Sequence, residues 1–173
     1  AYRSVQRLHR DVPLGGVLRA VHYWAANLMV VTVLLHMLRV FITGSYKHPR
    51  ELTWVAGTML FLLTFSCGFT GYLLPWDQKA YWATVVGTNI AGSAPLIGGA
   101  ALAVLRGGEQ LGAVTLARFY GVHVWVLPAT LLVLVGIHLF AVIRQGIAAS
   151  PRRRPLVELE PGLSRREAYE REY

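Results

Sequence analysis

Four histidines lie at matched positions on two apolar segments of the chain. His22 and His36 are fourteen residues apart in the first segment, and His123 and His138 are fifteen residues apart in the second. On an α-helix these steps are about 21 and 22 Å long and return to within about 40° and 60° of the starting face. Each helix would thus present two imidazoles on one side. Paired across a helical bundle, they would form two bis-histidine sites, the arrangement that two stacked b-type haems require for axial ligation of iron.

An arginine flanks each histidine of the first segment. Arg19 precedes His22 by three residues and Arg39 follows His36 by three, so each arginine lies toward the membrane surface from its histidine. There it can pair with a haem propionate, whose negative charge is costly near a bilayer, although an arginine can also simply anchor a helix end.

Gly57 and Gly71 repeat the fourteen-residue interval. A missing Cβ lets a flat ring or a neighbouring helix approach the backbone. Each glycine therefore favours a haem beside it, with ordinary helix packing as the alternative.

The helices that position these residues are predicted to cross a membrane. The chain is 54% hydrophobic, and several windows without Asp, Glu, Lys or Arg are long enough to cross the bilayer core, which takes about 20 helical residues. These windows are residues 20–38, 52–76, 80–105 and 119–143. The sequence therefore predicts an all-α integral membrane protein.

Three of the four windows are predicted to be spans, over about residues 19–43, 52–75 and 118–143. The third window, residues 80–105, contains four glycines and Pro95, which a lipid-exposed helix would not tolerate. We expect two short apolar helices there, on or partly in the membrane surface; four spans remain the alternative. Lys and Arg counts near the span ends do not decide the orientation. The short basic loop "GSYKHPRE" makes the first two spans antiparallel neighbours.

The chain is expected to divide into a surface connector (1–18), a transmembrane di-haem domain (19–149) and a polar tail (150–173). The connector is expected to hold a short amphipathic helix ended by Gly15 and Gly16. In the tail, Ser164 and Glu167 fit a capping box that opens a last short helix. The formal charge of +8 is spread over loop ends and the tail, which favours lipid headgroups over nucleic acid as the partner.

The stretch "GYLLPWDQKAYWATVVG" combines the acid Asp77 with interfacial aromatic side chains and a broken apolar helix. Such a setting could enclose a lipid-soluble quinol near the haem held by His22 and His123, although an aromatic belt would look similar. The only cysteine, Cys67, excludes an internal disulfide and the Cys-x-x-Cys-His attachment of haem c.

These residues resemble cytochrome b of the quinol-oxidising bc-type complexes, and especially the short split form, cytochrome b6. The resemblance covers about residues 1–150 and rests on "RAVHYW", "LHMLRVFITGSYKHPRELTW", "GFTGYLLPWDQKAYWA", "TLARFYGVHVWVLP" and "HLFAVIRQGI". The fifteen-residue spacing of the second histidine pair points to the split form. The three spans would then match the second to fourth helices of the family's four-helix bundle, with the first and third spans parallel.

The resemblance implies a role for each candidate residue. His22 and His123 would ligate the low-potential haem, and His36 and His138 the high-potential haem. The other implied site residues are Arg19 and Arg118 near the low-potential haem, Arg39 and Trp54 at the propionates of the other, and Phe69, Tyr72, Trp82 and Ala83 in the wall of the quinol-oxidation pocket.

The implied activity is quinol oxidation by a respiratory or photosynthetic complex in a bacterial inner or thylakoid-type membrane. A quinol would give one electron to a Rieske iron–sulfur protein and one to the low-potential haem, and the second electron would cross to a quinone, storing a proton gradient. Expected partners are the Rieske protein, a cytochrome c1, f or other c-type cytochrome, and a second cytochrome b subunit, in a homodimeric complex.

Two departures from the family qualify the resemblance. The family's first helix has no counterpart, so we expect it to be missing, disordered or supplied separately. Cys67 does not match the cysteine that holds an extra haem c in cytochrome b6, which leaves the presence of that haem open. The Pro-Glu-Trp-Tyr motif of the oxidation pocket is also absent, as expected if a second subunit carries it. Two alternatives are a di-haem anchor that links a dehydrogenase or hydrogenase to quinone, and a haem-free channel or transporter.

Overall fold

The computed structural model describes residues 1–108 and 110–148, and the segments with regular structure in this part of the chain are all helical. In chain order they are α1 (Tyr2–Asp11), α2 (Gly15–Ile42), α3 (Glu51–Leu73), α4 (Gln78–Gly92), α5 (Gly98–Arg106), α6 (Ala113–Gly121), the π-helical turn η1 (Val122–Val126) and α7 (Leu127–Gln145). The predicted tail helix at Ser164 and Glu167 lies outside the described residues. The all-α prediction is confirmed.

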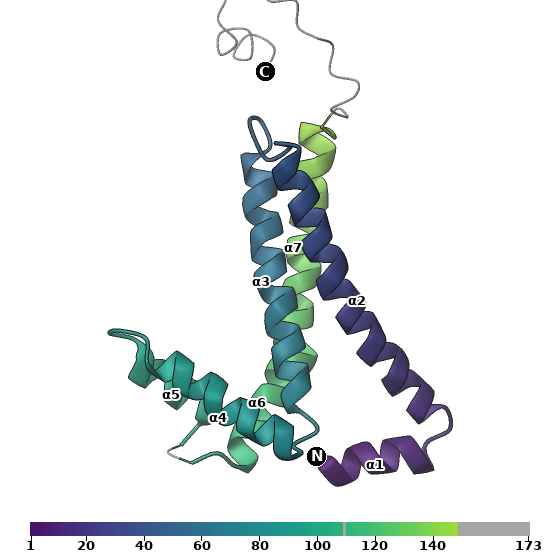
Figure 1. Ribbon diagram of the computed structural model, residues 1–173, viewed down its shortest axis with the longest axis vertical. Helices are drawn as coiled ribbons and strands as arrows, with labels where there is room; N and C mark the ends of the chain where they lie inside the picture. The colour runs from purple at the N-terminus through teal and green to yellow at the C-terminus, as the bar shows by residue number, and fades with distance from the viewer. Residues whose placement is uncertain (109, 149–173) are drawn as a thin grey trace, which may run out of the picture.

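Within the described residues, three helices are long and apolar enough to cross a membrane, as predicted. They are α2, α3 and the continuous run of 33 residues from Ala113 to Gln145 that joins α6, η1 and α7. The loop of residues 43–50 joins α2 and α3 at one end of the bundle, so the two helices are antiparallel (Figure 1). The first and third spans are therefore parallel.

Helix α3 is the centre of the bundle. It packs along α7, and it meets α2 near their shared loop, where the two helices converge in Figure 1. Small side chains such as Ala56 on α3 and Ala141 on α7 are buried, which lets the backbones come close.

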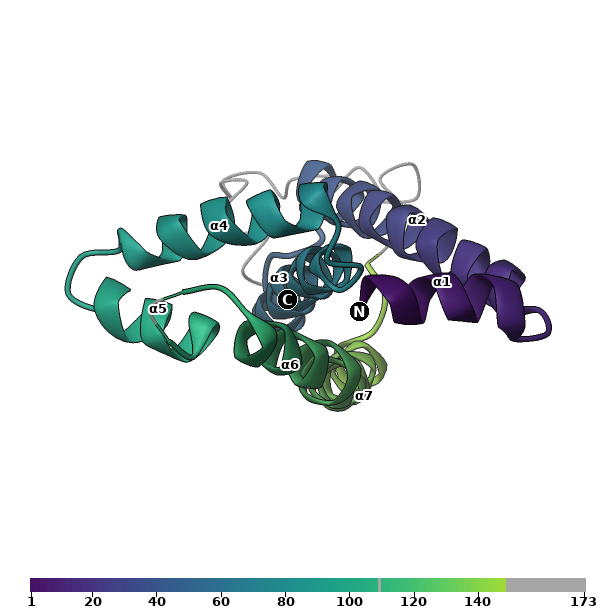
Figure 2. The same ribbon diagram turned by 90° about the horizontal axis from the view of Figure 1, so that it is seen from below.

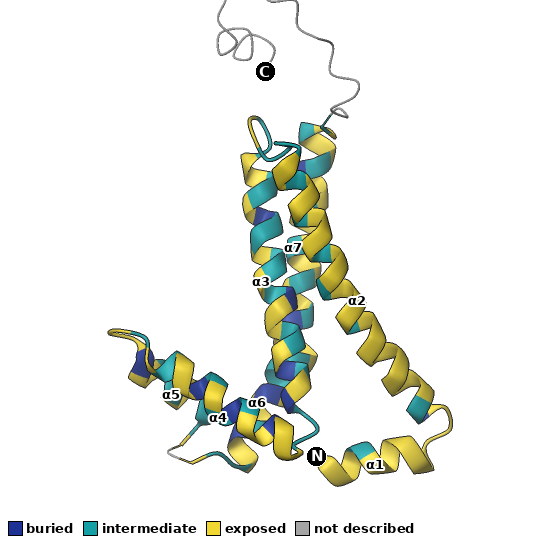
Figure 3. Cartoon of the chain, viewed as in Figure 1, coloured by how far each residue is buried: buried dark blue, intermediate teal, exposed yellow. Residues whose placement is uncertain are grey.

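In contrast, α2 diverges from the other two spans. Within the described residues no Cα of α2 lies within 8 Å of a Cα of α7, and Figure 3 shows α2 exposed along most of its length. Trp24, for example, exposes 70% of its surface. Lipid or neighbouring protein is the natural environment of such a helix, because apolar side chains lose nothing by facing hydrocarbon. Only side chains therefore bridge the space between α2 and α7.

The predicted pair of short helices in residues 80–105 is confirmed as α4 and α5. Both run crosswise to the spans at the end that also carries α1, and they lie side by side (Figures 1 and 2). Asp77 caps α4, because its carboxylate accepts a hydrogen bond of 2.8 Å from the Ala80 N–H. A Cβ at Gly98 would collide with the Gly92 carbonyl oxygen, so glycine permits the tight corner between the two helices.

The boundary between the first two helices differs from the prediction. The expected amphipathic helix α1 is present but ends at Asp11, and α2 begins at Gly15 instead of near residue 19. Gly15 and Gly16 thus start a span instead of ending the connector. The reason is steric: a Cβ at Gly15 would collide with the Leu8 carbonyl oxygen, so the glycine lets α1 and α2 meet at a sharp corner.

Candidate functional site

The first predicted histidine pair is brought together by the fold. His22 lies on α2 and His123 on η1, and their ring centroids are 6.2 Å apart with the planes at 82°. Two imidazoles that bind one metal from opposite sides have centroids roughly 6 Å apart, since a metal–nitrogen bond is about 2 Å long. Arg19, one helical turn before His22, is exposed at the same end of α2.

Helix α3 forms the wall behind His123. A Cβ on Gly71 would lie 2.6 Å from His123 Cε1, closer than side chains ever pack, so only glycine leaves space for this ring. Thr70 Oγ1 lies 3.0 Å from His123 Nδ1 and also donates its own proton to a backbone carbonyl, that of Ser66 at 2.9 Å. The hydroxyl therefore accepts the Nδ1 proton, which leaves Nε2 of His123 unprotonated, as a metal ligand must be.

A π-helical turn explains how fifteen residues can separate His123 and His138. In η1 the N–H of Leu127 bonds to the carbonyl of Val122, five residues back instead of four. The wider turn absorbs one residue, so the remaining offset between the two histidines is about 40°, the same as for a fourteen-residue step. The sequence-based offset of about 60° was therefore too large, because it assumed an unbroken α-helix.

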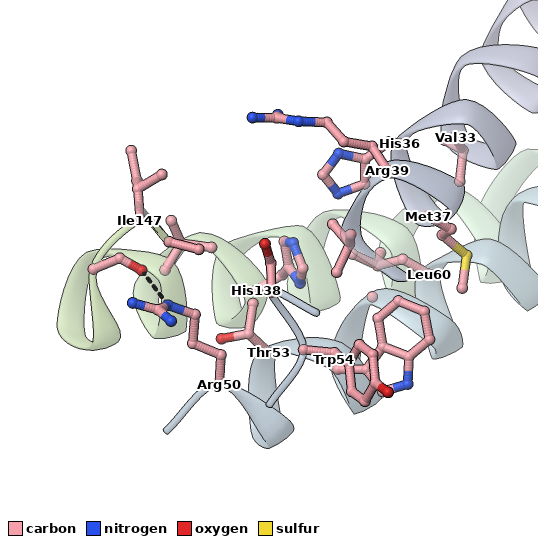
Figure 4. A pocket seen from close by; sticks show the side chains of 17 residues that line it. Val33, His36, Met37, Arg39, Arg50, Thr53, Trp54, Leu60, His138 and Ile147 are labelled. Atoms are coloured by element: carbon pink, nitrogen blue, oxygen red, sulfur yellow. Dashed lines mark hydrogen bonds between the residues drawn. The ribbon is translucent and has the colours of Figure 1, made fainter. Parts of the chain in front are cut away.

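The second histidine pair lines a cavity of about 240 Å³ at the opposite end of the bundle. Figure 4 shows His36 from α2 facing the side of the cavity that carries His138 from α7. The cavity also contains Arg39, Trp54 and Gly57, so five residues predicted for one haem site converge here. One water needs only about 10–15 Å³, so this space is much larger than an ordinary packing defect.

Glycine again provides room for the imidazole. A Cβ on Gly57 would lie 3.2 Å from His138 Cε1, and Gly57 is fourteen residues before Gly71. The His138 Nδ1 atom is buried and has no hydrogen-bond partner in the described part of the chain. The predicted glycine spacing thus marks the two places where α3 receives an imidazole of the third span.

Several cavity residues were not identified from the sequence. Tyr46 stacks on Phe41 with 5.8 Å between ring centroids and lies 5.4 Å from the Trp54 ring. Arg50 donates to the Gly146 carbonyl at 3.1 Å, and Thr53 bonds to the Gln145 side chain, which ties α3 to the end of α7. The sequence signal for them is the loop "GSYKHPRE", which carries an aromatic residue and two cations at the level of Arg39.

The residues present fit haem better than a bare metal ion. Residues 1–108 and 110–148 contain no group of three or more His, Cys, Asp or Glu side chains that could hold a metal ion. Each site instead offers two imidazoles across the space between α2 and the third span, with glycine behind one of them. A porphyrin supplies the other ligands of its iron, so two protein ligands suffice.

The residues predicted for the quinol pocket lie around α3 and α4 but do not line one cavity. Phe69 rests against Gly87, where a Cβ would come within 2.5 Å of its ring, and faces Phe119 at 6.5 Å. Tyr72 and Trp82 are exposed, and Ala83 is half-buried. A cavity of about 280 Å³ near them is lined by other residues, namely Tyr81, Val85, Asn89, Arg106, Gln110 and Leu111.

Arg118 contacts the surface helices. Its guanidinium donates to the carbonyls of Ala103, at 3.0 Å, and Val104, at the end of α5. Nearby, Arg106 donates to Thr88 at 2.9 Å and to Asn89 at 2.7 Å. The two arginines thereby fasten α5 to α6 and α4, next to the region that the resemblance assigns to quinol.

Comparison with known proteins identifies the family. Residues 27–166 match the family described as "Cytochrome b(N-terminal)/b6/petB", which covers most of the chain. The chain belongs to the cytochrome b family. Members of this family bind haem b, and the chain is an integral membrane protein.

The relatives come from both branches of the family. The chain is 45% identical over 148 residues to cytochrome b6 of Prochlorococcus marinus (strain MIT 9211). The aligned region covers 86% of this chain and 68% of that protein. It is 48% identical over 149 residues to the menaquinol:cytochrome c reductase cytochrome b subunit of Geobacillus thermodenitrificans, covering 86% of this chain and 66% of that one.

The helical arrangement also matches a solved structure. A chain of "Hyperthermophilic respiratory Complex III" aligns with a TM-score of 0.81 and 33% identity, over 93% of this cytochrome b chain. This chain spans 44% of that solved chain and about two thirds of the curated relatives.

Proposed function

We propose that this cytochrome b chain is the di-haem subunit of a quinol oxidoreductase that passes electrons to cytochrome c or a plastocyanin-type acceptor. The observation that carries the proposal is the pairing of four histidines at opposite ends of one bundle, His22 with His123 and His36 with His138, in a member of the cytochrome b family. Bound haems would supply one-electron redox chemistry at two depths of the membrane.

Within this proposal, the chain's residues hold and orient the cofactors. His22 and His123 would ligate the low-potential haem, and His36 and His138 the high-potential haem. Arg39 and Trp54 line the second cavity, where a cation and an indole N–H can bind propionate oxygens. Arg19 is exposed one turn from His22, and Arg118 lies at the same end of the bundle, so both can neutralise charge there.

The quinol would bind beside the first histidine pair. Phe69, Tyr72, Trp82 and Ala83 provide aromatic and small side chains around the corner between α3 and α4, which suits contact with an apolar ring. A Rieske iron–sulfur protein would accept one electron of the quinol, and a c-type cytochrome would carry it away. A second cytochrome b subunit would complete the pocket in a homodimeric complex, and proton release and uptake on opposite sides would contribute to a gradient.

A di-haem anchor for a dehydrogenase or hydrogenase is the second candidate. The observation that favours it is that none of the four residues proposed for the quinol wall lines the nearby cavity. Such an anchor needs the histidine pairs but not a quinol-oxidation pocket.

The two candidates are separated by adding an inhibitor of quinol oxidation to the native membrane complex. We expect the inhibitor to stop cytochrome c reduction and to shift the absorbance of the haem at His22 and His123. An unperturbed haem spectrum, in a complex that copurifies with a dehydrogenase or hydrogenase, would favour the anchor instead.

A further inference from the structure

Helix α3 presents a glycine to each histidine of the third span, and the residue before the glycine differs between the two sites. Gly57 receives the His138 ring and Gly71 receives the His123 ring. The residue before Gly57 is Ala56, whereas the residue before Gly71 is Thr70, and each exposes only 6% of its surface. The first site thus has a buried hydroxyl group next to its glycine, and the second site has none there.

This hydroxyl contacts the imidazole directly. Thr70 Oγ1 lies 3.0 Å from His123 Nδ1, and its proton is used by the carbonyls of Ser66 at 2.9 Å and Cys67 at 3.2 Å. The oxygen is therefore an acceptor for the Nδ1–H of His123. At the other site, Ala56 has no oxygen on its side chain, and no side chain in the described part of the chain bonds to His138 Nδ1. The α3 backbone interacts with both imidazoles, at Cys67 with His123 and at Thr53 with His138. The side-chain atoms particular to the first site are therefore Thr70 Oγ1 and the more distant Cys67 Sγ, 3.8 Å from His123 Nδ1.

A hydrogen bond accepted from the outer nitrogen of a ligating imidazole makes the ligating nitrogen more basic. A more basic ligand stabilises ferric over ferrous iron, and outer hydrogen bonds are one of the means by which a protein sets a haem potential. The hydroxyl also fixes the tautomer and the orientation of the ring.

We propose that Thr70 is a positioning residue that lowers the midpoint potential of the haem held by His22 and His123 relative to the haem held by His36 and His138. The inference rests on the proposed function, since it requires haem at both pairs. It predicts that the difference between the two midpoint potentials depends on one buried hydroxyl group. It also predicts that a hydroxyl group introduced at position 56 lowers the potential of the other haem.

The test is an optical redox titration of the native complex carrying Thr70→Val, Thr70→Ser or Ala56→Ser. Valine keeps the shape of threonine and removes the oxygen, and serine keeps the oxygen. We expect Thr70→Val to raise the potential of the first haem and change the electron-sharing equilibrium between the haems about tenfold, or about 59 mV for a one-electron couple. Thr70→Ser should restore the wild-type value, and Ala56→Ser should lower the potential of the other haem.

The haem content of each variant separates this inference from the proposed function. Two low-spin haems in Thr70→Val with both potentials unchanged would overturn the role of Thr70 while leaving the di-haem assignment intact. Equal shifts of both haems, or a shift that Thr70→Ser reproduces, would also overturn it, because the effect would then not come from the hydroxyl. A wild-type complex without two b-type haems would instead overturn the proposed function, and this inference with it.

Discussion

At the residue scale, the candidate sites depend on two glycines of α3 as much as on the four histidines. The imidazole of His123 rests against α3 only because Gly71 has no Cβ, and a Cβ on Gly57 would crowd His138. The sequence could predict the importance of both glycines, since their interval equals that of His22 and His36. It could not predict that each glycine receives an imidazole, because spacing along one helix does not fix which neighbour it faces.

Alanine substitutions in α3 should therefore have graded effects on haem content. A Cβ would lie 2.6 Å from His123 at Gly71 and 3.2 Å from His138 at Gly57, whereas at Gly68 it would meet nothing within 4 Å. We expect Gly71→Ala to displace its histidine and reduce occupancy of that haem severely, Gly57→Ala to weaken the other haem mildly, and Gly68→Ala to leave both unchanged. Pyridine haemochrome quantification and optical spectra of the purified complex measure this order.

The same series has a clear contrary outcome. If Gly71→Ala and Gly68→Ala lowered haem content equally, the effect would come from the general packing of α3 and not from room for the imidazole.

At the element scale, the third span depends on a π-helical turn that the apolar pattern did not reveal. Pro128 has no N–H for the Val124 carbonyl, and a proline ring clashes with the carbonyl four residues before it. The helix widens in this region, and η1 covers Val122–Val126. Pro128 is visible in the sequence, but tertiary packing decides whether the helix kinks at a proline or accommodates an extra residue in a π-turn. By contrast, the glycines and Pro95 sufficed to predict α4 and α5.

Deleting Val124 should be tolerated at the haem sites. The deletion shortens the step from His123 to His138 to fourteen residues, so a regular α-turn can replace the π-turn while the two imidazoles keep their mutual offset of about 40°. We expect both haems to remain, as counted by absorbance after purification.

A matched insertion serves as the comparison. One alanine added between Val133 and Leu134 lies in regular α7 and rotates the two histidines relative to each other by about 100°. It should abolish one haem site. If the deletion removed a haem as completely as the insertion does, the π-turn would not be what keeps His123 and His138 in alignment.

At the scale of the whole molecule, α2 stands apart from the third span. It meets α3 near the loop and α1 at the other end, and among the described residues its backbone does not contact α7. The sequence could predict three spans and their antiparallel order from charge-free windows and a short loop. It could not predict the divergence of α2, since the apolar stripe of a span looks the same whether it faces lipid, protein or cofactor.

Removal of haem should therefore loosen α2 more than α3. Ligation would link α2 to the third span at two levels, and a ligand that binds only the folded form stabilises the contacts it makes. Hydrogen exchange of the native complex before and after haem extraction should show a larger loss of protection in Gly15–Ile42 than in Glu51–Leu73. Equal losses in the two helices would contradict this linking role.

The most direct test of the central claim is a reductive titration of the native complex in histidine variants. The chain has six histidines, and His48, which lies 3.5 Å from Glu51 in the loop, is outside both pairs and serves as the control. We predict two b-type haem components in the wild type and in His48→Leu, and loss of a different single component in His22→Leu and in His36→Leu. Two intact components in either of the last two variants, or loss of the same component in both, would contradict the assignment of one haem to each histidine pair.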